Sequence, residues 1–534
     1  RASGIGGYRV YGRKGYFLFI TRAENQLWLP GADGLHGGGH VVKRVQDYRW
    51  VTVDLKKVLV KPSDEQELSA AAAFMTSFIV DDLHFFCETY DVTRPFPSLH
   101  DPILDPCPEF WWNEDLSAPF RSIGLSFCCV PLVQGIVAAK KLTPSTPSTL
   151  QVTLATIIRK SCLNAGTRYY SRGLNDVGGV GNEAEEEHLM FFYRPEGVVF
   201  STWLVRRGTV PVHWQTRLVS TLSTSSEITI DQDPFYAVND YWSRLRDRYG
   251  DVPVCCVNLL KNKEPESRLT KAFHESIVKV REELCMDVQI LHFDWHHNFE
   301  VAKDWCIQEL WDVKKQFFLQ HGLTTGFLRR LDSTSSVGEV EFEADPTILQ
   351  RQKGFFRVNC ADSLDRTNLE IFFSGLQIMA QQCLCNCRVN IADSSWMDEP
   401  DMELLSTVMD CSALSSLGDH ILSSKQLRVP TSVGKTNEGG VSSGSSSPVS
   451  DPASPDVAED LPGCHSNVDW PFLALTPDQI GRLFSIQLVD MLAEMTVNAG
   501  NIMSLLYTNT DAMFTQHIRA YAPHLPSAPS NMWI

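Results

Sequence analysis

The sequence lacks any apolar run long enough to cross a membrane as a helix. Its longest weakly polar stretch, Ser122–Ala139, is interrupted by Pro131 and Gln134 and predicts two buried strands instead. The sequence is also poor in positive charge, because 47 Lys and Arg residues stand against 64 Asp and Glu residues and give a formal net charge of −17. This balance disfavours nucleic acid as a partner, and an anionic substrate needs a local positive site.

The cysteines form neither a disulfide framework nor a metal-binding pattern. There are 15 of them among 534 residues, an odd number without a short repeating spacing, which is typical of reduced thiols in the cytosol. Cys383, Cys385 and Cys387 alternate near the end of a predicted helix, without the further cysteine or histidine pair that a zinc site requires. We therefore expect buried or idle thiols and no metal site.

The pattern of apolar residues indicates an α/β protein. Short β-rich runs punctuated by Gly, Pro or Asp predict strands in the first half of the chain, at residues 16–20, 51–53, 58–60 and 150–158. Further on, a buried strand at Val254–Leu260, a helical stretch that ends near Leu284 and a second strand at Val288–Trp295 have the order of an α/β unit.

The composition changes sharply after Val429. Residues 430–463 are rich in Ser, Gly, Pro and Asp, and they contain too little apolar surface to order themselves, so we expect a disordered insert there. Helical signals return at Thr476, which precedes Pro477 and forms a capping box with Gln479.

A cysteine six positions before an arginine is one way to build a phosphate site. The five intervening residues let backbone N–H groups converge on one anion, and the arginine can bind two phosphate oxygens. The same positive field favours the thiolate, which is the nucleophilic form of cysteine. This spacing occurs twice, at Cys162–Arg168 and at Cys360–Arg366.

The surroundings favour the second segment. A predicted strand at Gly354–Asn359 precedes Cys360, and a helical apolar pattern follows Arg366, at Leu369, Phe372, Phe373, Leu376, Met379, Ala380 and Cys383. After Arg168, only Tyr169–Arg172 precede Gly173, which is too short for a helix whose dipole matters. We therefore interpret Cys162 as a half-buried thiol near the end of a strand.

Residues Arg357–Asn368 resemble the signature loop of the Sac-domain phosphoinositide phosphatases. Ser363 stands where the family usually has a second cysteine, as in the large plant-type subgroup, and the acidic block Glu183–Glu187 departs from the family pattern. Further blocks resemble the family in order, namely Leu29–Gly31, His40–Val45, Tyr90–Arg94, Phe110–Asn113, Pro131–Gly135, Ala165–Tyr169, Arg207–Gly208 with Pro211 and Trp214, Val257–Leu260, Phe293–His297 and Tyr507–Thr510.

The resemblance implies an α/β fold in two parts. These are a β-rich N-terminal Sac subdomain, residues 1–182, and a catalytic Sac subdomain with the Cys360 loop, residues 183–429. The insert, residues 430–463, then separates it from a helical C-terminal part of the same subdomain, residues 464–534.

The implied activity is hydrolysis of a phosphomonoester from the inositol ring of membrane phosphoinositides, such as PI4P or PI(4,5)P2. The implied partners are these lipids, without nucleic acid, cofactor or transmembrane segment. The implied location is cytoplasmic, peripheral on the cytosolic face of endomembranes or the plasma membrane.

The resemblance also assigns the site residues. Cys360 is expected to attack phosphorus, Arg366 to hold phosphate oxygens, and Asp365 to act as general acid, by its match to the similar myotubularin loop. Asp365 is alternatively a residue that only holds the loop in shape. The expected substrate-binding residues surround these three, namely Asn359, Ala361, Asp362, Ser363, Leu364, Thr367 and Asn368, and no metal ligand is expected.

Three other interpretations of the chain stay open. A myotubularin-type lipid phosphatase shares the Cys-x-Asp-x-x-Asp-Arg-Thr arrangement, and a protein tyrosine or dual-specificity phosphatase fits a generic loop of this spacing. A catalytically idle Sac module that binds lipid as a scaffold is the third. Arg244, Arg246 and Arg248 form the densest basic run, which is either a solvated face or a region that orients the protein on an anionic membrane.

Overall fold

A computed structural model describes the chain over the following residues: 2–31, 39–55, 64–78, 80–81, 83–98, 105–142, 150–218, 226–302, 305–331, 341–410, 483–484, 486–514 and 517–518. Its helices are α1 (Asp64–Ser77), η1 (Pro108–Phe110), α2 (Glu114–Ser122), η2 (Ser126–Cys128), α3 (Val238–Tyr249), α4 (Glu266–Leu284), α5 (Trp295–Ala302), α6 (Trp305–His321), α7 (Asp365–Arg388), α8 (Met402–Val408) and α11 (Ile486–Thr508). Its strands are β1 (Gly4–Tyr11), β2 (Lys14–Pro30), β3 (Gly39–Asp54), β4 (His84–Phe86), β5 (Val133–Leu142), β6 (Gln151–Lys160), β7 (Ala184–Arg194), β8 (Gly197–Gly208), β9 (Trp214–Leu218), β10 (Ser226–Ile230), β11 (Val254–Asn258), β12 (Val288–His292), β13 (Thr324–Leu331), β14 (Glu341–Phe342), β15 (Thr347–Gln350), β16 (Phe355–Asn359), β17 (Val389–Asn390) and β18 (Ser395–Trp396).

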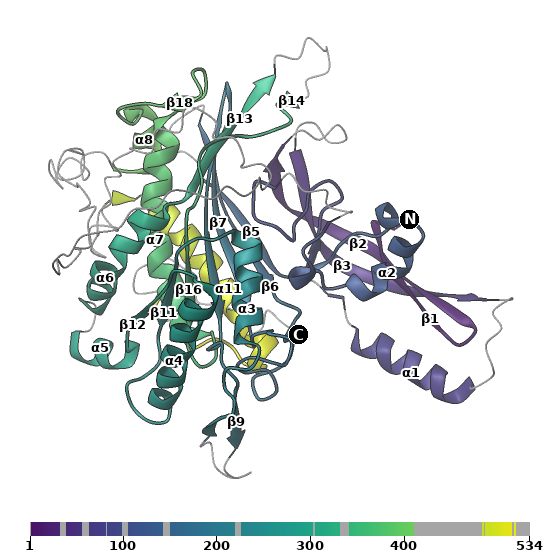
Figure 1. Ribbon diagram of the computed structural model, residues 1–534. Helices are drawn as coiled ribbons and strands as arrows, with labels where there is room; N and C mark the ends of the chain where they lie inside the picture. Colours follow the sequence, from purple (N-terminus) through teal and green to yellow (C-terminus); the bar gives the residue numbers. More distant parts are fainter. Residues whose placement is uncertain are drawn as a thin grey trace, which may run out of the picture.

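Fourteen of these strands form one large sheet (Figure 1). Strands β1 to β8 follow one another in chain order, each antiparallel to the next. Beyond β8, the strands β16, β11 and β12 pair in parallel, and β13 adds antiparallel to the other end of β8. The parallel part places β16 between β8 and β11, with the carboxyl ends of all three at one edge of the sheet.

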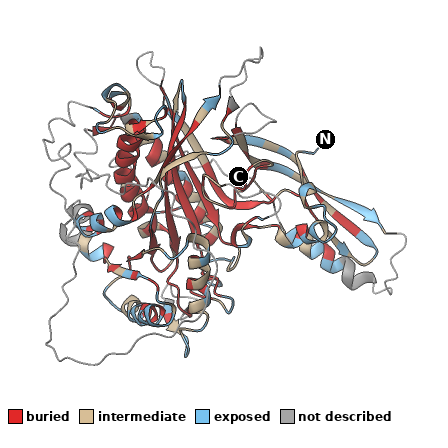
Figure 2. Ribbon diagram, turned by 45° about the horizontal axis from the view of Figure 1, so that its top comes forward, coloured by how far each residue is buried: buried red, intermediate tan, exposed pale blue. Residues whose placement is uncertain are grey.

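Helices cover both faces of the parallel part, which explains its continuous apolar strands. Along β11, Cys255 and Val257 join a core with α6 and α7, whereas Val254 and Cys256 join a core with α3 and α4. Successive side chains of a strand point to opposite faces, so a strand covered on both faces needs apolar residues throughout. Buried residues accordingly dominate this body in Figure 2.

Helix α7 is buried on nearly all sides rather than on one face. The apolar pattern predicts an amphipathic helix, yet the polar residues Glu370, Gln377, Gln381 and Asn386 are buried as well. Helices α8 and α11 pack against α7, and Lys314 of α6 pairs with Glu370, so neighbouring elements cover the polar side. Helix α11 also contacts β5 and β6, so the segment beyond residue 482 returns to the same sheet.

The N-terminal strands form a more exposed arm. Strands β1 to β3 and helix α1 extend from the main body in Figure 1, and Figure 2 shows many of their residues as exposed. The sheet nevertheless continues from this arm into the body, because β4 pairs with β3 on one side and with β5 on the other.

The structure confirms most of the predicted elements. The α/β fold class is correct, and the predicted strands at residues 16–20, 51–53 and 150–158 lie in β2, β3 and β6. The predicted unit between residues 254 and 295 is present as β11, α4 and β12. Residues 58–60, the insert at 430–463 and the cap at Thr476 lie outside the described residues.

The prediction of two buried strands in Ser122–Ala139 is wrong for its first half. Only β5 is a strand there, and η2 and an irregular turn precede it. Gly124 has a positive φ of 74°, which interrupts an extended strand, and Ile123 and Phe127 stand 67% and 65% exposed. Among the described residues, none of the helices has the length and apolarity that a membrane span needs.

Candidate active site

The Cys360 loop lies at the carboxyl edge of the parallel strands. Strand β16 ends at Asn359, and α7 begins at Asp365, so residues 360–364 connect a strand directly to the N-terminus of a helix. Ligands in such sheets bind beyond the carboxyl ends of the strands, and the N-terminus of a helix favours anions. The predicted order of strand, loop and helix is therefore present.

The sulfur of Cys360 is buried and receives two hydrogen-bond donors. Cys360 is 2% exposed, and its Sγ lies 3.1 Å from the backbone nitrogen of Ser363 and 3.4 Å from Oγ1 of Thr367. Ser363 has a φ of 54°, in the left-handed region, and this turn of the backbone allows its N–H to point back at the sulfur. Ser363 lies in the loop, and Thr367 lies in the first turn of α7.

The guanidinium of Arg366 is held by a residue that the sequence did not reveal. Glu266, the first residue of α4, accepts two hydrogen bonds from it, at 2.8 and 3.0 Å, and Leu259 accepts a third through its carbonyl oxygen. Burial opposes the charge, but Cys360 and Glu266 outweigh it and hold the pKa of Arg366 above its usual range. Arg366 therefore stays charged beside Cys360.

Arg168, which ends the other Cys-x5-Arg segment, and Arg172, four residues later, hold the loop through Asp362. Arg168 lies 2.8 Å from Oδ2 of Asp362, and Arg172 donates to Oδ1. The sequence presents Arg168 both as the end of a competing motif and as part of the block Ala165–Tyr169, which resembles the family. Arg172 follows that block by three residues, and this nearness is the signal that could have pointed to it.

Side chains from neighbouring segments donate hydrogen bonds to two backbone carbonyl groups of the loop. The side chain of Asn182 donates to the carbonyl oxygen of Asp362 at 2.9 Å, and Arg207 donates to that of Ser363 at 2.7 Å. Ala361 and Leu364 are each 7% exposed and pack into separate hydrophobic clusters. These contacts fix the course of the loop between β16 and α7.

Asp365 connects the loop to the C-terminal segment. Its Oδ1 accepts hydrogen bonds from the backbone nitrogens of Met513 and Phe514, at 2.9 and 3.2 Å.

Two further residues that the sequence predicts for the site are buried on either side of the loop. Asn359 donates to Oδ1 of Asn258 at 2.7 Å, and Asn368 is buried in the first turn of α7.

The sulfur of Cys162 has a different environment. It follows the end of β6, is partly buried, and donates to the carbonyl oxygens of Pro108 and Glu109, at 3.3 and 3.2 Å. Burial and the charge of Glu109 raise the pKa of the Cys162 thiol to about 12. The interpretation of Cys162 as a half-buried thiol near a strand end is confirmed.

Comparison with known proteins places the chain in a family. The family model described as the SacI homology domain matches residues 3–300, more than half of the 534 residues. The chain belongs to the SacI homology domain family. The resemblance noted in the sequence is thereby confirmed, and the matched residues end before the Cys360 loop.

The chain is similar to proteins from animals, fungi and plants. It is 30% identical to Synaptojanin-1 of Rattus norvegicus over 275 residues, which are 51% of this chain and 16% of that protein. It is 26% identical to the Polyphosphoinositide phosphatase of Schizosaccharomyces pombe over 423 residues, 72% of this chain and 44% of the relative. It is 25% identical to the Phosphoinositide phosphatase SAC4 of Arabidopsis thaliana over 427 residues, 70% and 49% respectively. The matched segments thus span less than half of each relative.

The glutamates of the acidic block are buried, and each forms an ion pair with a buried arginine. Four glutamates of Glu183–Glu187 lie at or in β7, and each is paired inside the fold. Burial disfavours the charge of Glu185, but Arg248 and Arg159 lower its pKa to about 2. The buried pairs are Glu183 with Arg206, Glu185 with Arg159 and Arg248, Glu186 with Arg207, and Glu187 with Arg159.

The densest basic run is not a free cationic face. Arg248 pairs with the buried Glu185, Arg244 donates to the carbonyl oxygen of Gly178, and Arg246 donates to that of Leu284. A role of this run in orienting the protein on a membrane is therefore disfavoured, because its guanidinium groups are engaged within the fold.

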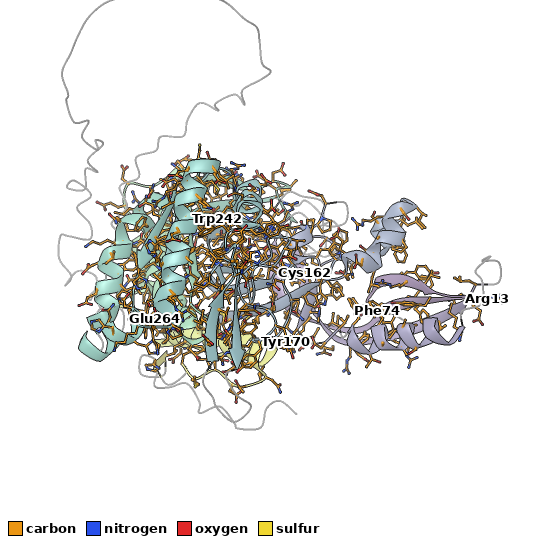
Figure 3. All side chains as sticks on the ribbon, turned by 60° about the horizontal axis from the view of Figure 1, so that its bottom comes forward. Arg13, Phe74, Cys162, Tyr170, Trp242 and Glu264 are labelled. Atoms are coloured by element: carbon orange, nitrogen blue, oxygen red, sulfur yellow. The ribbon has the colours of Figure 1, made fainter. Side chains whose placement is uncertain are left out.

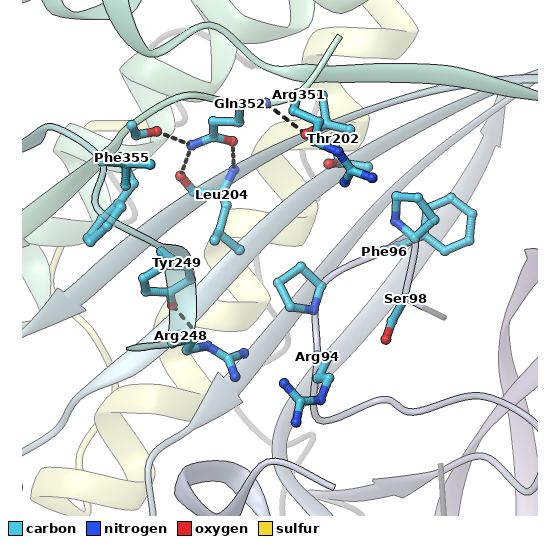
Figure 4. Close-up of a pocket in the computed structure, with 15 residues that line it drawn as sticks. Arg94, Phe96, Ser98, Thr202, Leu204, Arg248, Tyr249, Arg351, Gln352 and Phe355 are labelled. Carbon is cyan, nitrogen blue, oxygen red and sulfur yellow. Dashed lines mark hydrogen bonds between the residues drawn. The ribbon is translucent and has the colours of Figure 1, made fainter. Parts of the chain in front are cut away.

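Another arginine-lined pocket lies away from the loop (Figure 4). It has a volume of about 510 Å³ and is lined in part by Arg94, Arg248 and Arg351. Gly354 and Phe355 also line it, so it lies at the start of β16, whereas Cys360 follows the end of that strand. It is therefore separate from the candidate active site.

Proposed function

We propose that the chain hydrolyses a phosphomonoester on the inositol ring of a membrane phosphoinositide. The observation that carries this proposal is the Cys360–Arg366 loop, which connects β16 to α7 and directs two hydrogen-bond donors at the cysteine sulfur. The fungal and plant relatives are both named as phosphatases of phosphoinositides, which supports the substrate class.

In the first step, the Cys360 thiolate attacks phosphorus in line with the inositol oxygen. The S–P bond forms while the P–O bond to the ring breaks, so the intermediate is a phosphocysteine. Arg366 and the N–H groups at the start of α7 stabilise the charge on the phosphoryl oxygens. These groups supply the electrostatic stabilisation, so the proposed reaction needs no metal.

Glu266 is expected to orient Arg366 for this task. The two hydrogen bonds between them fix the plane of the guanidinium, and they keep it charged next to the sulfur. A phosphate in the loop can then accept from the N–H groups of Arg366 that face the loop, in a geometry already set before binding.

Asp365 is the proposed general acid. The inositol oxygen is a poor leaving group as an alkoxide, so it must take a proton as the P–O bond breaks. A water molecule then attacks phosphorus, Asp365 accepts its proton, and the S–P bond breaks to release inorganic phosphate. The carboxylate is positioned for this by the backbone of Met513 and Phe514, which hold its Oδ1.

The substrates proposed first are PI4P and PI(4,5)P2, presented on the cytosolic face of a membrane. Phosphate release is measured on vesicles that each carry one phosphoinositide, with a phosphotyrosine peptide as the comparison substrate. Release from one or more lipids and not from the peptide is expected. Release from the peptide alone would indicate a protein phosphatase, and vesicle binding without release would indicate a lipid-binding scaffold.

A further inference from the structure

Three exposed hydrophobic side chains lie on segments that are fastened to the Cys360 loop. Tyr170 is 88% exposed, Met513 is 77% exposed, and Tyr169 is 48% exposed. Single exposed hydrophobic residues are ordinary on protein surfaces, but a group of them around one site indicates a contact surface. We call Tyr169, Tyr170 and Met513 the apolar rim.

Both parts of the apolar rim are connected to the loop by direct contacts. Tyr169 and Tyr170 follow Arg168, whose guanidinium pairs with Asp362 at 2.8 Å and lies 5.9 Å from the centre of the Tyr169 ring. The backbone nitrogen of Met513 donates to Asp365 at 2.9 Å. A surface that contacts the apolar rim therefore lies next to the Cys360 loop.

The two segments that carry the apolar rim lie side by side. The backbone nitrogen of Arg168 donates to the carbonyl oxygen of Tyr507 at 2.8 Å, and the hydroxyl of Tyr507 donates to the carbonyl oxygen of Ser171 at 2.9 Å. Figure 3 shows Tyr170 beside the yellow C-terminal segment. The exposed side chains thus belong to one region of the surface.

The charge of the protein favours an apolar attachment over an electrostatic one. The chain carries a formal net charge of −17, which opposes its approach to an anionic membrane. The run Arg244–Arg248 is engaged inside the fold and does not offset this repulsion. Tyrosine side chains favour the boundary between lipid and water, and a methionine side chain gains by burial there whatever the sign of the surface charge.

We propose that the apolar rim inserts into the surface of the bilayer that carries the substrate and so presents the Cys360 loop to a lipid headgroup. This proposal rests on the proposed function, because the bilayer is identified as the occupant by its continuity with the phosphate site. The rim sets which face of the protein meets the membrane, whereas the loop performs the chemistry.

Flotation with vesicles tests this inference without requiring turnover. Vesicles of phosphatidylcholine, with and without a minor fraction of PI4P, are mixed with the full chain or with the double variant Tyr170→Ser, Met513→Ser. We expect the double variant to bind about tenfold less to the vesicles with PI4P, because two apolar side chains no longer insert. Its melting temperature should match that of the native chain, since both side chains are exposed.

The matched control removes two other strongly exposed hydrophobic side chains, away from the Cys360 loop. The variant Ile123→Ser, Phe127→Ser changes two residues that are 67% and 65% exposed, one directly after α2 and one in η2, and it should bind like the native chain. The pair Tyr170→Trp, Met513→Leu keeps the apolar area and should also bind like the native chain. Equal losses in both serine variants, or no loss in the rim variant, would overturn the proposal.

The same vesicles separate this inference from the proposed function. If binding depends on the apolar rim but no phosphate is released, the docking surface is supported and the phosphatase proposal is contradicted. If the chain releases phosphate from a short-chain soluble phosphoinositide but does not float with vesicles, the phosphatase proposal is supported and the docking surface is ruled out.

Discussion

The segments Cys162–Arg168 and Cys360–Arg366 share one spacing and differ in the direction of the hydrogen bonds at sulfur. The sulfur of Cys360 accepts from Ser363 and Thr367, whereas that of Cys162 donates to two backbone carbonyl groups. A sulfur that receives donors is prepared to carry negative charge, and one that donates keeps its proton. The spacing alone does not decide this, because it does not fix which way the surrounding backbone groups point.

The arginines that end the two segments also differ, in the partners that they bind. Arg366 stays beside its own cysteine and is oriented by Glu266, whereas Arg168 pairs with Asp362 of the other segment. The first segment therefore supports the second instead of competing with it. The comparison teaches that a motif is defined by the elements around it: a strand and the 24 residues of α7 flank the second segment, and no such helix follows the first.

Replacing the two sulfurs gives the largest expected difference. Cys360→Ser should lower phosphate release from phosphoinositide vesicles by about 10³-fold or more, because a hydroxyl of much higher pKa replaces the nucleophilic thiolate. Cys162→Ser should keep most of the activity, since that sulfur only donates to carbonyl groups. A large loss in the Cys162 variant, with an active Cys360 variant, would reverse the assignment of the two loops.

Asp365→Asn is expected to lower release from the lipid by about 10²-fold, because the inositol oxygen loses its proton donor. The amide oxygen of Asn can still accept from Met513 and Phe514, so the connection to the C-terminal segment is kept. An aryl phosphate with an activated leaving group serves as the control, and its hydrolysis should change little. Equal losses on both substrates would show that Asp365 holds the loop in shape.

The sequence could predict the order of strand, loop and helix around the motif. The strand before Cys360 and the helix after Arg366 follow from apolar patterns within a few residues of the motif, and both are present as β16 and α7. Glu266 and Arg172 lie far from the loop in sequence, and the sheet topology brings them to it. No local pattern contains that information.

The acidic block shows the same limit in energetic terms. Three consecutive glutamates resemble an exposed, charged segment, yet Glu185 is buried between Arg159 and Arg248. Burying one such charge alone is costly, so its burial depends on partners from other strands and helices. The prediction for Ser122–Ala139 is wrong in the opposite sense: it expects a buried strand where the structure has an exposed turn. Apolar residues at a surface turn resemble a strand in the sequence.

The pairing of Arg168 with Asp362 is expected to have a smaller effect on activity. Arg168→Gln should lower kcat/KM by about tenfold, because it removes one of the two contacts that hold Asp362 while Arg172 keeps the other. Asp362→Asn should lower kcat/KM at least as much, because the uncharged amide weakens both contacts. The double variant should be little worse than Asp362→Asn alone, since that single variant already removes the ion pair with Arg168. Losses that multiply would mean that Arg168 acts on the substrate independently of Asp362.

The smallest expected effect is on the reactivity of Cys162 itself. Its thiol has a pKa of about 12, raised by burial and by Glu109, so only about one molecule in 10⁵ carries the thiolate at pH 7. Iodoacetamide at pH 7 should therefore modify the exposed Cys285 well before Cys162, as read by mass spectrometry of peptides. Because the thiolate fraction rises about tenfold with each pH unit below the pKa, labelling of Cys162 should keep increasing up to pH 10. Rapid labelling of Cys162 at pH 7 would mean that its sulfur is activated, and the distinction between the two segments would then be lost.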